Sequence, residues 1–438
     1  MANKKPEITE RPQEKAFLVG VELYNHPGLL KLEDSLAELE RLAETAGLEV
    51  VGELTQKIDR PSSDTYIGSG KVEELRAFVD ETLADVIIFD NDLSPRHQRE
   101  LEKIFGLKVR ILDRTALILD IFGQHASTRE GIYQVELAQY EYRLPRLTRA
   151  WTHLARQAGG GGGTAGSVGG VGLRGPGETQ LELDKREISK RIQKLKIEIE
   201  KIREHRNQYR QQRKRSKTPI VALVGYTNAG KSTLLNKLAK TDIYVADQLF
   251  ATLDPTTRKV MLPDKRIILM TDTVGFIQKL PAQLIAAFRA TLEEISDADL
   301  LLHVIDVTHP VAKEQAASVI QTLKEIKADH IPVINVLNKI DQLTPEQLAA
   351  IRLDEFPESV AISGLTGLGI EALLTKIDSL LFQAYIPIKV KLPYSEGQLI
   401  SLIHESGQVE SIKYGSKVVE ITGKIPGRLY ARFQQFEA

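Results

Sequence analysis

The segment with the clearest chemical potential is eight residues long and contains Gly225, Tyr226, Thr227, Asn228, Ala229, Gly230, Lys231 and Ser232. This spacing of two glycines, a lysine and a serine builds a phosphate-binding loop when a strand precedes it and a helix follows it. The glycines let backbone N–H groups converge on phosphate oxygens, and the helix N-terminus adds a partial positive charge. We expect Lys231 to reach the β and γ phosphates of a nucleotide, Ser232 to hold magnesium, and Thr233 to complete the nucleotide-binding loop.

A second group of residues could sense the terminal phosphate: Asp272, Thr273, Val274 and Gly275. In such a turn the aspartate binds magnesium through water, while the glycine N–H donates to the γ-phosphate and so reports its loss. The pattern is weak alone, but it is specific at this distance behind a phosphate-binding loop. We therefore expect Lys231 and Gly275 to act in catalysis, together with Thr252 from the upstream segment described next.

Magnesium needs a further oxygen ligand from upstream of this turn. The segment 250–257 offers Thr252, Thr256 and Thr257. We favour Thr252, because the other two threonines lead into a strand that we expect at 258–262. The predicted magnesium ligands are then Ser232, Thr252 and Asp272.

Two later segments have the residue types that distinguish guanine from adenine. The first follows an apolar strand expected at 333–337 and contains Asn338, Lys339 and Asp341. The Asp341 carboxylate can accept from guanine N1–H and N2–H₂, a pattern that adenine lacks, so ATP would leave it unpaired. Asn338 would support the loop, and the Lys339 stem would cover the base. The second segment, whose backbone donors we expect near the guanine oxygen although such turns are common, contains Ser363, Gly364 and Leu365.

Two further residues bear on hydrolysis. Phe276 stands where many GTPases have the glutamine that orients the attacking water, and a phenyl ring cannot hydrogen-bond that water. We therefore expect slow hydrolysis by the free protein and a need for a docked partner. The phosphate loop resembles that of GTPases in which an asparagine at the place of Asn228 helps to coordinate a monovalent cation such as K⁺, and this resemblance implies the same role here. A loop-stabilising asparagine is the alternative, and equal turnover in potassium and sodium buffers would favour it.

These residues need a parallel α/β scaffold, and the sequence provides one. Apolar strands are expected at 220–224, 266–271, 333–337 and 359–362, and each runs into one of the segments above, as in a P-loop GTPase domain. Near the N-terminus, short apolar runs alternate with helical patterns, which predicts a small parallel α/β unit. Its expected strands are 19–23, 48–54, 86–89 and 109–112, and its expected helices lie near 30–46, 70–82 and 95–105. The predicted division of this α/β multidomain chain is 15–112, 113–217, 218–384 and a small C-terminal α/β domain at 385–438.

Residues 113–217 are expected to form a helical hairpin with a glycine-rich tip. Eleven of the nineteen residues at 159–177 are glycine, which leaves too few side chains for a core. The flanking helices, expected at 129–144 and 178–217, would pair antiparallel through a narrow apolar seam. The seam residues of the second helix are Ile188, Ile192, Leu195, Ile199 and Ile202.

The second helix of this hairpin is strongly basic. Residues 185–217 contain fourteen Lys or Arg and four Glu, in a chain whose formal net charge is −1. A solvated helical face is the usual meaning of such a run, but this local excess favours contact with a polyanion. A glycine loop that served only as a hinge would not require it.

The composition excludes several other classes of protein. With 438 residues, 42% of them hydrophobic and 27% charged, the chain is typical of multidomain globular proteins. It has no cysteine, which excludes disulfides, thiolate zinc sites and a cysteine nucleophile. No apolar run has the length of a membrane span or of a signal-peptide core. We expect a cytoplasmic protein without stable membrane insertion, monomeric when free.

The order of the motifs resembles the translation-factor-related class of GTPases, and the chain from about residue 17 onward is similar to the ribosome-associated HflX family. The most specific similarity is the glycine-rich run 159–175 with the helix entry 176–182, Pro-Gly-Glu-Thr-Gln-Leu-Glu; 66–71 and 250–257 also look like that family. The resemblance implies a GTP hydrolase that uses Mg²⁺ and binds the large (50S) ribosomal subunit and its rRNA through region 129–217. It further implies a factor that splits or remodels stalled or idle ribosomes in its GTP state, notably under heat stress, with hydrolysis stimulated by the ribosome.

Other function classes could use the same phosphate loop. A small-molecule kinase is disfavoured by residues 338–341 and by the lack of an acceptor site in the sequence, and phosphate release to water alone would exclude it. A GTP-dependent scaffold for a protein or membrane partner would co-sediment with neither ribosomes nor rRNA. The family resemblance also implies that the N-terminal unit could use ATP, but no second phosphate loop supports this: 68–71 lacks the first glycine and is expected to be a strand-to-helix turn.

Overall fold

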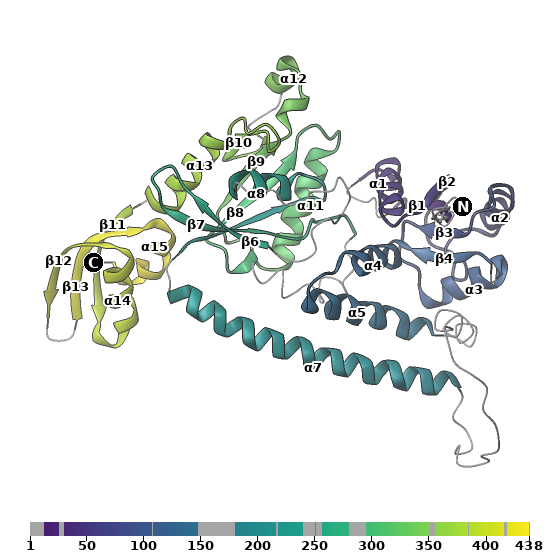
Figure 1. The fold of residues 1–438 in the computed structure, drawn as a ribbon, viewed down its shortest axis with the longest axis horizontal. Coiled ribbons are helices and arrows are strands. Elements are labelled where there is room, and N and C mark those ends of the chain that lie inside the picture. Colours follow the sequence, from purple (N-terminus) through teal and green to yellow (C-terminus); the bar gives the residue numbers. More distant parts are fainter. Residues whose placement is uncertain are drawn as a thin grey trace, which may run out of the picture. The chain divides into compact units, whose positions relative to one another are not determined.

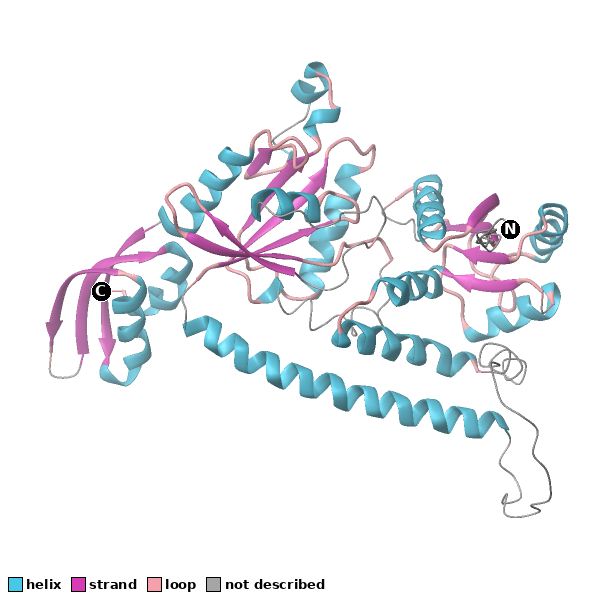
Figure 2. Ribbon diagram, viewed as in Figure 1, coloured by secondary structure: helices cyan, strands magenta, loops and turns pink. Residues whose placement is uncertain are grey.

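The computed structural model describes residues 13–25, 30–106, 108–147, 180–215, 218–239, 250, 256–279, 295–350, 355–383, 385–415 and 418–437. They form sheets of four, six and three strands with helices packed against them (Figures 1 and 2). The chain divides into two compact units. The first consists of Met1–Arg210, Asp247–Asp254 and Gln278–Ala290, and the second of Gln211–Ala246, Pro255–Ile277 and Thr291–Ala438.

The four-stranded sheet belongs to the first unit and is parallel throughout. Its strands are β1 (Lys15–Leu23), β2 (Glu49–Ile58), β3 (Val86–Phe89) and β4 (Arg110–Asp113). Their spatial order is β2-β1-β3-β4, which confirms the predicted parallel α/β unit. Because the order reverses between β1 and β3, the carboxyl ends of these two strands form a topological switch point, where such sheets commonly bind ligands.

Helices cover both faces of this sheet. α2 (Ser69–Thr82) and α3 (Pro95–Phe105) pack on one face, and α1 (Leu32–Thr45) and α4 (Arg114–His125) pack together on the other. Ser94 caps the N-terminus of α3, since its Oγ accepts from the His97 N–H at 3.2 Å, and α3 then covers the range 95–105 that the sequence predicts. Gly68 precedes the first residue of α2, so the fragment 68–71 is a helix start.

The two long helices of the predicted hairpin follow this sheet. They are α5 (Arg129–Arg143), followed by the short helical turn η1 (Leu144–Arg146), and α7 (Gln180–Arg215). Ile192 and Leu195 of the predicted seam are buried. Two ion pairs of 2.8 Å, Arg191 with Glu136 and Lys196 with Glu141, join α7 to α5, which confirms their pairing (Figure 1). The glycine-rich segment 159–177 lies outside the described residues.

The six-stranded sheet belongs to the second unit and has the order β10-β9-β8-β5-β7-β6. Its strands are β5 (Ile220–Gly225), β6 (Thr256–Met261), β7 (Ile267–Asp272), β8 (Leu300–Asp306), β9 (Val333–Asn338) and β10 (Ser359–Ala361). Only the edge pair β6 and β7 is antiparallel among these strands. β6 begins at Thr256, two residues before the strand expected at 258–262, so both Thr256 and Thr257 are strand residues.

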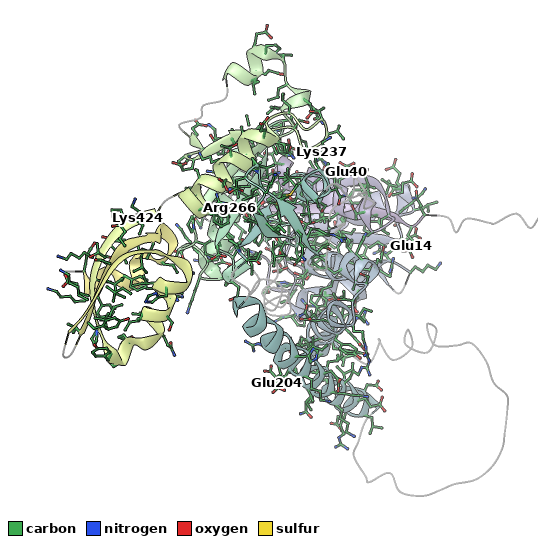
Figure 3. All side chains as sticks on the ribbon, turned by 60° about the vertical axis from the view of Figure 1, so that its left-hand side comes forward. Glu14, Glu40, Glu204, Lys237, Arg266 and Lys424 are labelled. Carbon is green, nitrogen blue, oxygen red and sulfur yellow. The ribbon has the colours of Figure 1, made fainter. Side chains whose placement is uncertain are left out.

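The described helices between and after these strands vary in how they relate to the sheet. They are α8 (Lys231–Ala239), α11 (Ala312–Glu325), η3 (Ile340–Gln342), α12 (Pro345–Ala350), α13 (Ile370–Asp378) and η5 (Ser379–Gln383). α8 and α13 share the main core on one face, α11 packs on the other, and α12 is exposed rather than packed on the sheet. Arg266, labelled in Figure 3, ties the sheet to α13 through a 2.9 Å ion pair with Asp378 and lies over the Phe382 ring.

The C-terminal residues form an antiparallel sheet with the order β11-β13-β12 and helices against it. Its elements are β11 (Tyr385–Pro393), η6 (Tyr394–Glu396), α14 (Gly397–Ser406), β12 (Gln408–Tyr414), β13 (Val418–Pro426), α15 (Gly427–Phe433) and η7 (Gln434–Phe436). Alternate strand residues such as Ile388, Val390 and Ile421 pack against Ile403 and Phe433 of the helices. This small core confirms the α/β character predicted for the C-terminal part.

Candidate functional site

The predicted site residues meet at one edge of the six-stranded sheet. Residues 225–233 follow β5, 272–275 end β7, 338–341 end β9, and 363–365 follow β10. These four strands run parallel, so their carboxyl ends lie at the same edge, where open α/β sheets bind ligands. Thr252 lies outside the described residues, and its role stays a prediction.

The phosphate loop begins where β5 passes close to β8. Gly225 has φ +153°, and a Cβ there would lie 2.3 Å from the Val304 carbonyl oxygen of β8. A side chain would therefore push the two strands apart at the start of the loop. Asn228 has φ 59°, the left-handed conformation that asparagine tolerates better than most residues. The loop then enters α8, in whose first turn Thr233 stands next to Ser232.

Lys231 is folded over this loop. Its buried ammonium donates to the carbonyl oxygens of Gly225 at 3.0 Å and Tyr226 at 2.7 Å. Burial lowers the pKa of Lys231 to about 8, and the nearby Asp272 carboxylate opposes that shift. A phosphate bound beside Lys231 would favour its charged form, because an adjacent anion stabilises a buried cation.

Two side chains with oxygen atoms that could bind a metal ion lie next to each other where α8 begins and β7 ends. The Ser232 hydroxyl donates to the Asp272 carboxylate with Oγ 2.6 Å from Oδ2. Hydroxyl and carboxylate oxygens are the ligand types that Mg²⁺ prefers, and P-loop GTPases generally use this ion. The pair therefore fits the ion that the sequence predicts there. Thr257 instead lies within β6, with its hydroxyl 3.0 Å from that of Thr271.

The predicted phosphate-sensing turn lies directly on the phosphate loop. The Phe276 N–H donates to the Gly225 carbonyl at 3.1 Å, and the Thr227 N–H donates to the Phe276 carbonyl at 2.8 Å. The Thr273 hydroxyl donates to a carbonyl of β5 at 2.6 Å. A Cβ at Gly275 would come within 2.9 Å of the Thr227 Cα. Any side chain at Gly275 would therefore displace the turn from the loop.

Asn338 joins the phosphate loop to the predicted base-reading loops. Its Nδ2 donates to the Ala229 carbonyl at 2.8 Å, and its Oδ1 accepts from the Gly364 N–H at 2.8 Å. The Asn338 side chain lies so close to Gly230 that a Cβ there would be 2.3 Å from Nδ2. The three loops are thus held together by one buried amide.

The rest of the base-reading region is shaped by an ion pair that the sequence motifs did not reveal. Lys339 has the left-handed φ of 68°, and its Nζ lies 2.7 Å from the carboxylate of Asp306, the last residue of β8. The sequence signal for this pair was Asp306 itself, an acidic residue at the end of the strand that lies between β5 and β9. Asp341 is exposed, so its carboxylate is open to a ligand.

The last predicted loop is fixed by its serine and open at its leucine. Ser363 is fully buried, and its Oγ accepts from the Thr366 N–H at 3.0 Å. The Leu365 residue is 70% exposed, and its carbonyl accepts from the Nζ of Lys237 at 3.3 Å. α8 thus supports this loop as well as the phosphate loop.

His303 makes the stability of this sheet depend on pH. It lies buried in β8, its Nδ1 3.0 Å from the Asn335 Oδ1, and burial lowers its pKa from 6.5 to about 4. The unfolded chain therefore takes up a proton before the folded one does, so stability is full above pH 6.5 and decreases as the pH falls toward 4. The decrease at pH 5 should be about 2 kcal/mol.

Urea unfolding of the wild type and of His303→Gln at pH 7 and pH 5 measures this contribution. Glutamine does not titrate, so the variant should lose about 2 kcal/mol less than the wild type between the two pH values. Equal losses in the two proteins would show that His303 does not titrate between these states.

Sequence models of three protein families match consecutive parts of the chain. The model described as GTP-binding GTPase N-terminal matches residues 33–123, and the one described as GTP-binding GTPase Middle Region matches 125–213. The model described as 50S ribosome-binding GTPase matches residues 220–339. The third match contains the phosphate loop, the sensing turn and the start of the base-reading loop.

Whole-chain relatives decide the family. The GTPase HflX of Caldanaerobacter subterraneus subsp. tengcongensis is 43% identical over 426 residues, which cover 97% of this chain and 94% of that protein. The chain belongs to the HflX family of GTPases. Another HflX GTPase, from Escherichia coli strain K12, is 43% identical over 378 residues, 86% of each protein.

A solved structure is also similar to this HflX family member. A GTP-binding protein from the hyperthermophilic archaeon Sulfolobus solfataricus, in complex with GDP, is 25% identical over 83% of this chain and 97% of that chain, with a TM-score of 0.41. Within the described ranges, no helix combines the length and the apolar character needed to cross a membrane.

Proposed function

We propose that this HflX family member binds and hydrolyses GTP at the edge formed by β5, β7, β9 and β10. The observation that carries the proposal is the Asn338 side chain, which bonds the phosphate loop to the base-reading loops. Lys231 would hold the β and γ phosphates, Gly275 would sense the γ-phosphate, and Asp341 would read guanine. Ser363, Gly364 and Leu365 would complete the base pocket.

Magnesium would be held by Ser232 and Asp272, with Thr252 as the further ligand. When bound, the ion would neutralise charge on the β and γ phosphates. The Ser232 and Asp272 oxygens, 2.6 Å apart, support the first two assignments. A K⁺ ion beside Asn228 stays a prediction, which the comparison of potassium and sodium buffers tests.

We further propose that the partner is the large ribosomal subunit and its rRNA, contacted through region 129–217. The support is the 50S ribosome-binding description of the matching family model and the charge of α7. Two basic residues of α7, Arg191 and Lys196, pair with glutamates of α5, so the available positive charge is smaller than the sequence count suggests. Lys185, Lys190 and Lys194 are exposed on the same helix.

In this proposal the GTP state splits or remodels stalled or idle ribosomes in the cytoplasm, and the protein is monomeric when free. The four-part division at 15–112, 113–217, 218–384 and 385–438 assigns ribosome contact to the second part and GTP turnover to the third. Phe276 is buried and cannot orient water, so the ribosome would supply or position the missing group and accelerate hydrolysis.

Sedimentation of intact ribosomes with the protein and a non-hydrolysable GTP analogue tests this function. We expect free subunits to replace intact ribosomes, and isolated large subunits to raise GTP turnover at least tenfold above the intrinsic rate, the order expected when a partner completes a GTPase site. Unchanged ribosome peaks would refute splitting, and an unchanged rate would refute stimulation.

A charge variant tests the contact surface. Replacing Lys185, Lys190 and Lys194 together by glutamine should weaken binding to large subunits on the order of tenfold and reduce its salt dependence, because phosphate contacts are lost. The matched control replaces three exposed lysines of the second unit, Lys265, Lys324 and Lys327. Equal binding by both triple variants would show that α7 does not contact rRNA.

A further inference from the structure

Lys279 stands four residues after Gly275 and is bonded into the first unit. Its Nζ forms an ion pair with the Oδ2 of Asp90, which directly follows β3. The Asp90 side chain is fully buried, while that of Lys279 is 34% exposed. Gly275 belongs to the second unit, whereas Lys279 and Asp90 belong to the first. The chain therefore passes from the phosphate-sensing turn into the N-terminal unit within four residues.

Asp90 lies at the topological switch point of the four-stranded sheet, in a cluster that needs a second cation. The Ser35 hydroxyl donates to it at 2.8 Å, and an Arg114 nitrogen donates at 2.6 Å. Arg114 also pairs with Glu38. Within this cluster two carboxylates, Asp90 and Glu38, meet one arginine, and Lys279 supplies the charge that balances them. The crevice where such sheets usually bind a ligand thus holds a lysine side chain.

The charged state of Asp90 depends on this arrangement. Burial alone would raise the pKa of Asp90, but the adjacent Arg114 and Lys279 outweigh it and keep the pKa below its ordinary value. Asp90 is therefore an anion at neutral pH and attracts Lys279 in surroundings that water screens poorly. Such a partly buried pair restrains a chain segment more than an exposed ion pair does.

The segment between the turn and Lys279 is held at both of its ends. Phe276 bonds to the phosphate loop through its N–H and its carbonyl. Lys279 has φ 55°, a left-handed conformation that is unfavourable for a lysine, and its pairing with Asp90 offsets that cost. Gln278 between them is buried. The segment that directly follows Gly275 is therefore bonded to the phosphate loop at Phe276 and to Asp90 at Lys279.

A second contact ties the segment upstream of β6 to the same unit. Phe250 lies with its ring centroid 4.6 Å from that of Phe122 in α4, and both residues belong to the first unit. Phe250 also has a left-handed φ, of 59°. Residues on both sides of the strand pair β6 and β7 are thus anchored on the N-terminal unit.

We propose that Lys279, held by Asp90, is a positioning residue that keeps the phosphate-sensing turn ordered, so that the N-terminal unit helps the protein to distinguish GTP from GDP. The inference rests on the proposed binding of GTP. A turn that is already restrained loses less conformational freedom when the Gly275 N–H binds the γ-phosphate. GDP lacks that phosphate, so its binding does not need the ordered turn.

Equilibrium binding of GDP and of guanosine 5′-[β,γ-imido]triphosphate to the full chain, with Mg²⁺, tests the inference. In Lys279→Met the affinity for the triphosphate analogue should fall about five- to tenfold. This is the loss expected if binding must also order roughly one more backbone residue. The affinity for GDP should change less than twofold. Lys279→Arg should keep the wild-type ratio of the two nucleotide affinities, because arginine retains the positive charge that pairs with Asp90.

The matched control is Lys265→Met. Lys265 is an exposed lysine with the same left-handed backbone, at φ 69°, in the turn between β6 and β7. It should change neither affinity. An unchanged affinity ratio in Lys279→Met would overturn the inference, and so would an equal loss for both nucleotides with a lower melting temperature, since that describes a structural role. A wild-type protein that binds neither nucleotide would refute the proposed GTP binding itself.

Discussion

Replacing Gly230 by alanine should abolish tight binding of guanine nucleotides. The added methyl group would lie 2.3 Å from the Asn338 Nδ2, at a residue whose φ is +92°. Asn338 would have to move and lose its bonds to Ala229 and Gly364, which separates the phosphate loop from the base-reading loop. Overpacking and the two lost buried hydrogen bonds together cost about 3–5 kcal/mol, which lowers GDP affinity more than a hundredfold.

Titration of the variant with a fluorescent GDP measures this loss. Gly397→Ala is the matched control, because the added methyl group would meet nothing within 4 Å at the start of α14. The control should bind GDP as the wild type does. Tight GDP binding by Gly230→Ala would mean that Asn338 does not bridge the two loops in the nucleotide-bound protein.

Replacing Asp341 by asparagine should change the base that the site accepts. The exposed carboxylate is the group that we expect to accept from guanine N1–H and N2–H₂, and an amide presents a donor toward the guanine amino group instead. GTP affinity should fall by about two to four orders of magnitude. Xanthine nucleotides, which have a carbonyl in place of that amino group, should gain affinity.

Competition of GTP and XTP for the site separates this prediction from general damage. Asp329→Asn, an exposed aspartate of the same unit outside the base-reading loops, is the control and should leave both affinities unchanged. If Asp341→Asn retained full GTP affinity without binding XTP, the carboxylate would not be the base reader. The Lys339 ion pair with Asp306 should persist in the variant, because Asp341 takes no part in it.

Local patterns predicted most of the scaffold because each depends on neighbouring residues. A β-branched strand before Gly225 and a helix after Lys231 place the phosphate loop without any distant contact. The helix expected near 95–105 is observed as α3 with these same bounds. In the parallel sheet, strand ends meet at one edge by topology alone, so the order of the motifs was sufficient to predict that they come together.

Contacts between distant residues could not be predicted in this way. Asp306 and Lys339 are 33 positions apart, and Asp90 and Lys279 are 189 positions apart, and in neither case does the spacing indicate a pair. The charge count of 185–217 also overstated the available positive charge, because Glu136 and Glu141 of α5 pair with two of its cations. Such pairings depend on which surfaces the fold brings together, and no local pattern encodes that.

The division of the chain into interleaved units constrains how it is made. Lys279 is synthesised 165 positions after Arg114 (279 − 114), although both serve the same carboxylate, Asp90. At about 5–20 residues per second this interval lasts roughly 8–33 s, during which the nascent N-terminal unit contains Asp90 and Glu38 with Arg114 but not with Lys279. Residues 13–215 therefore leave the ribosome before their last charge partner exists. Co-translational folding of this unit should finish only when the sensing turn of the GTPase domain has been made.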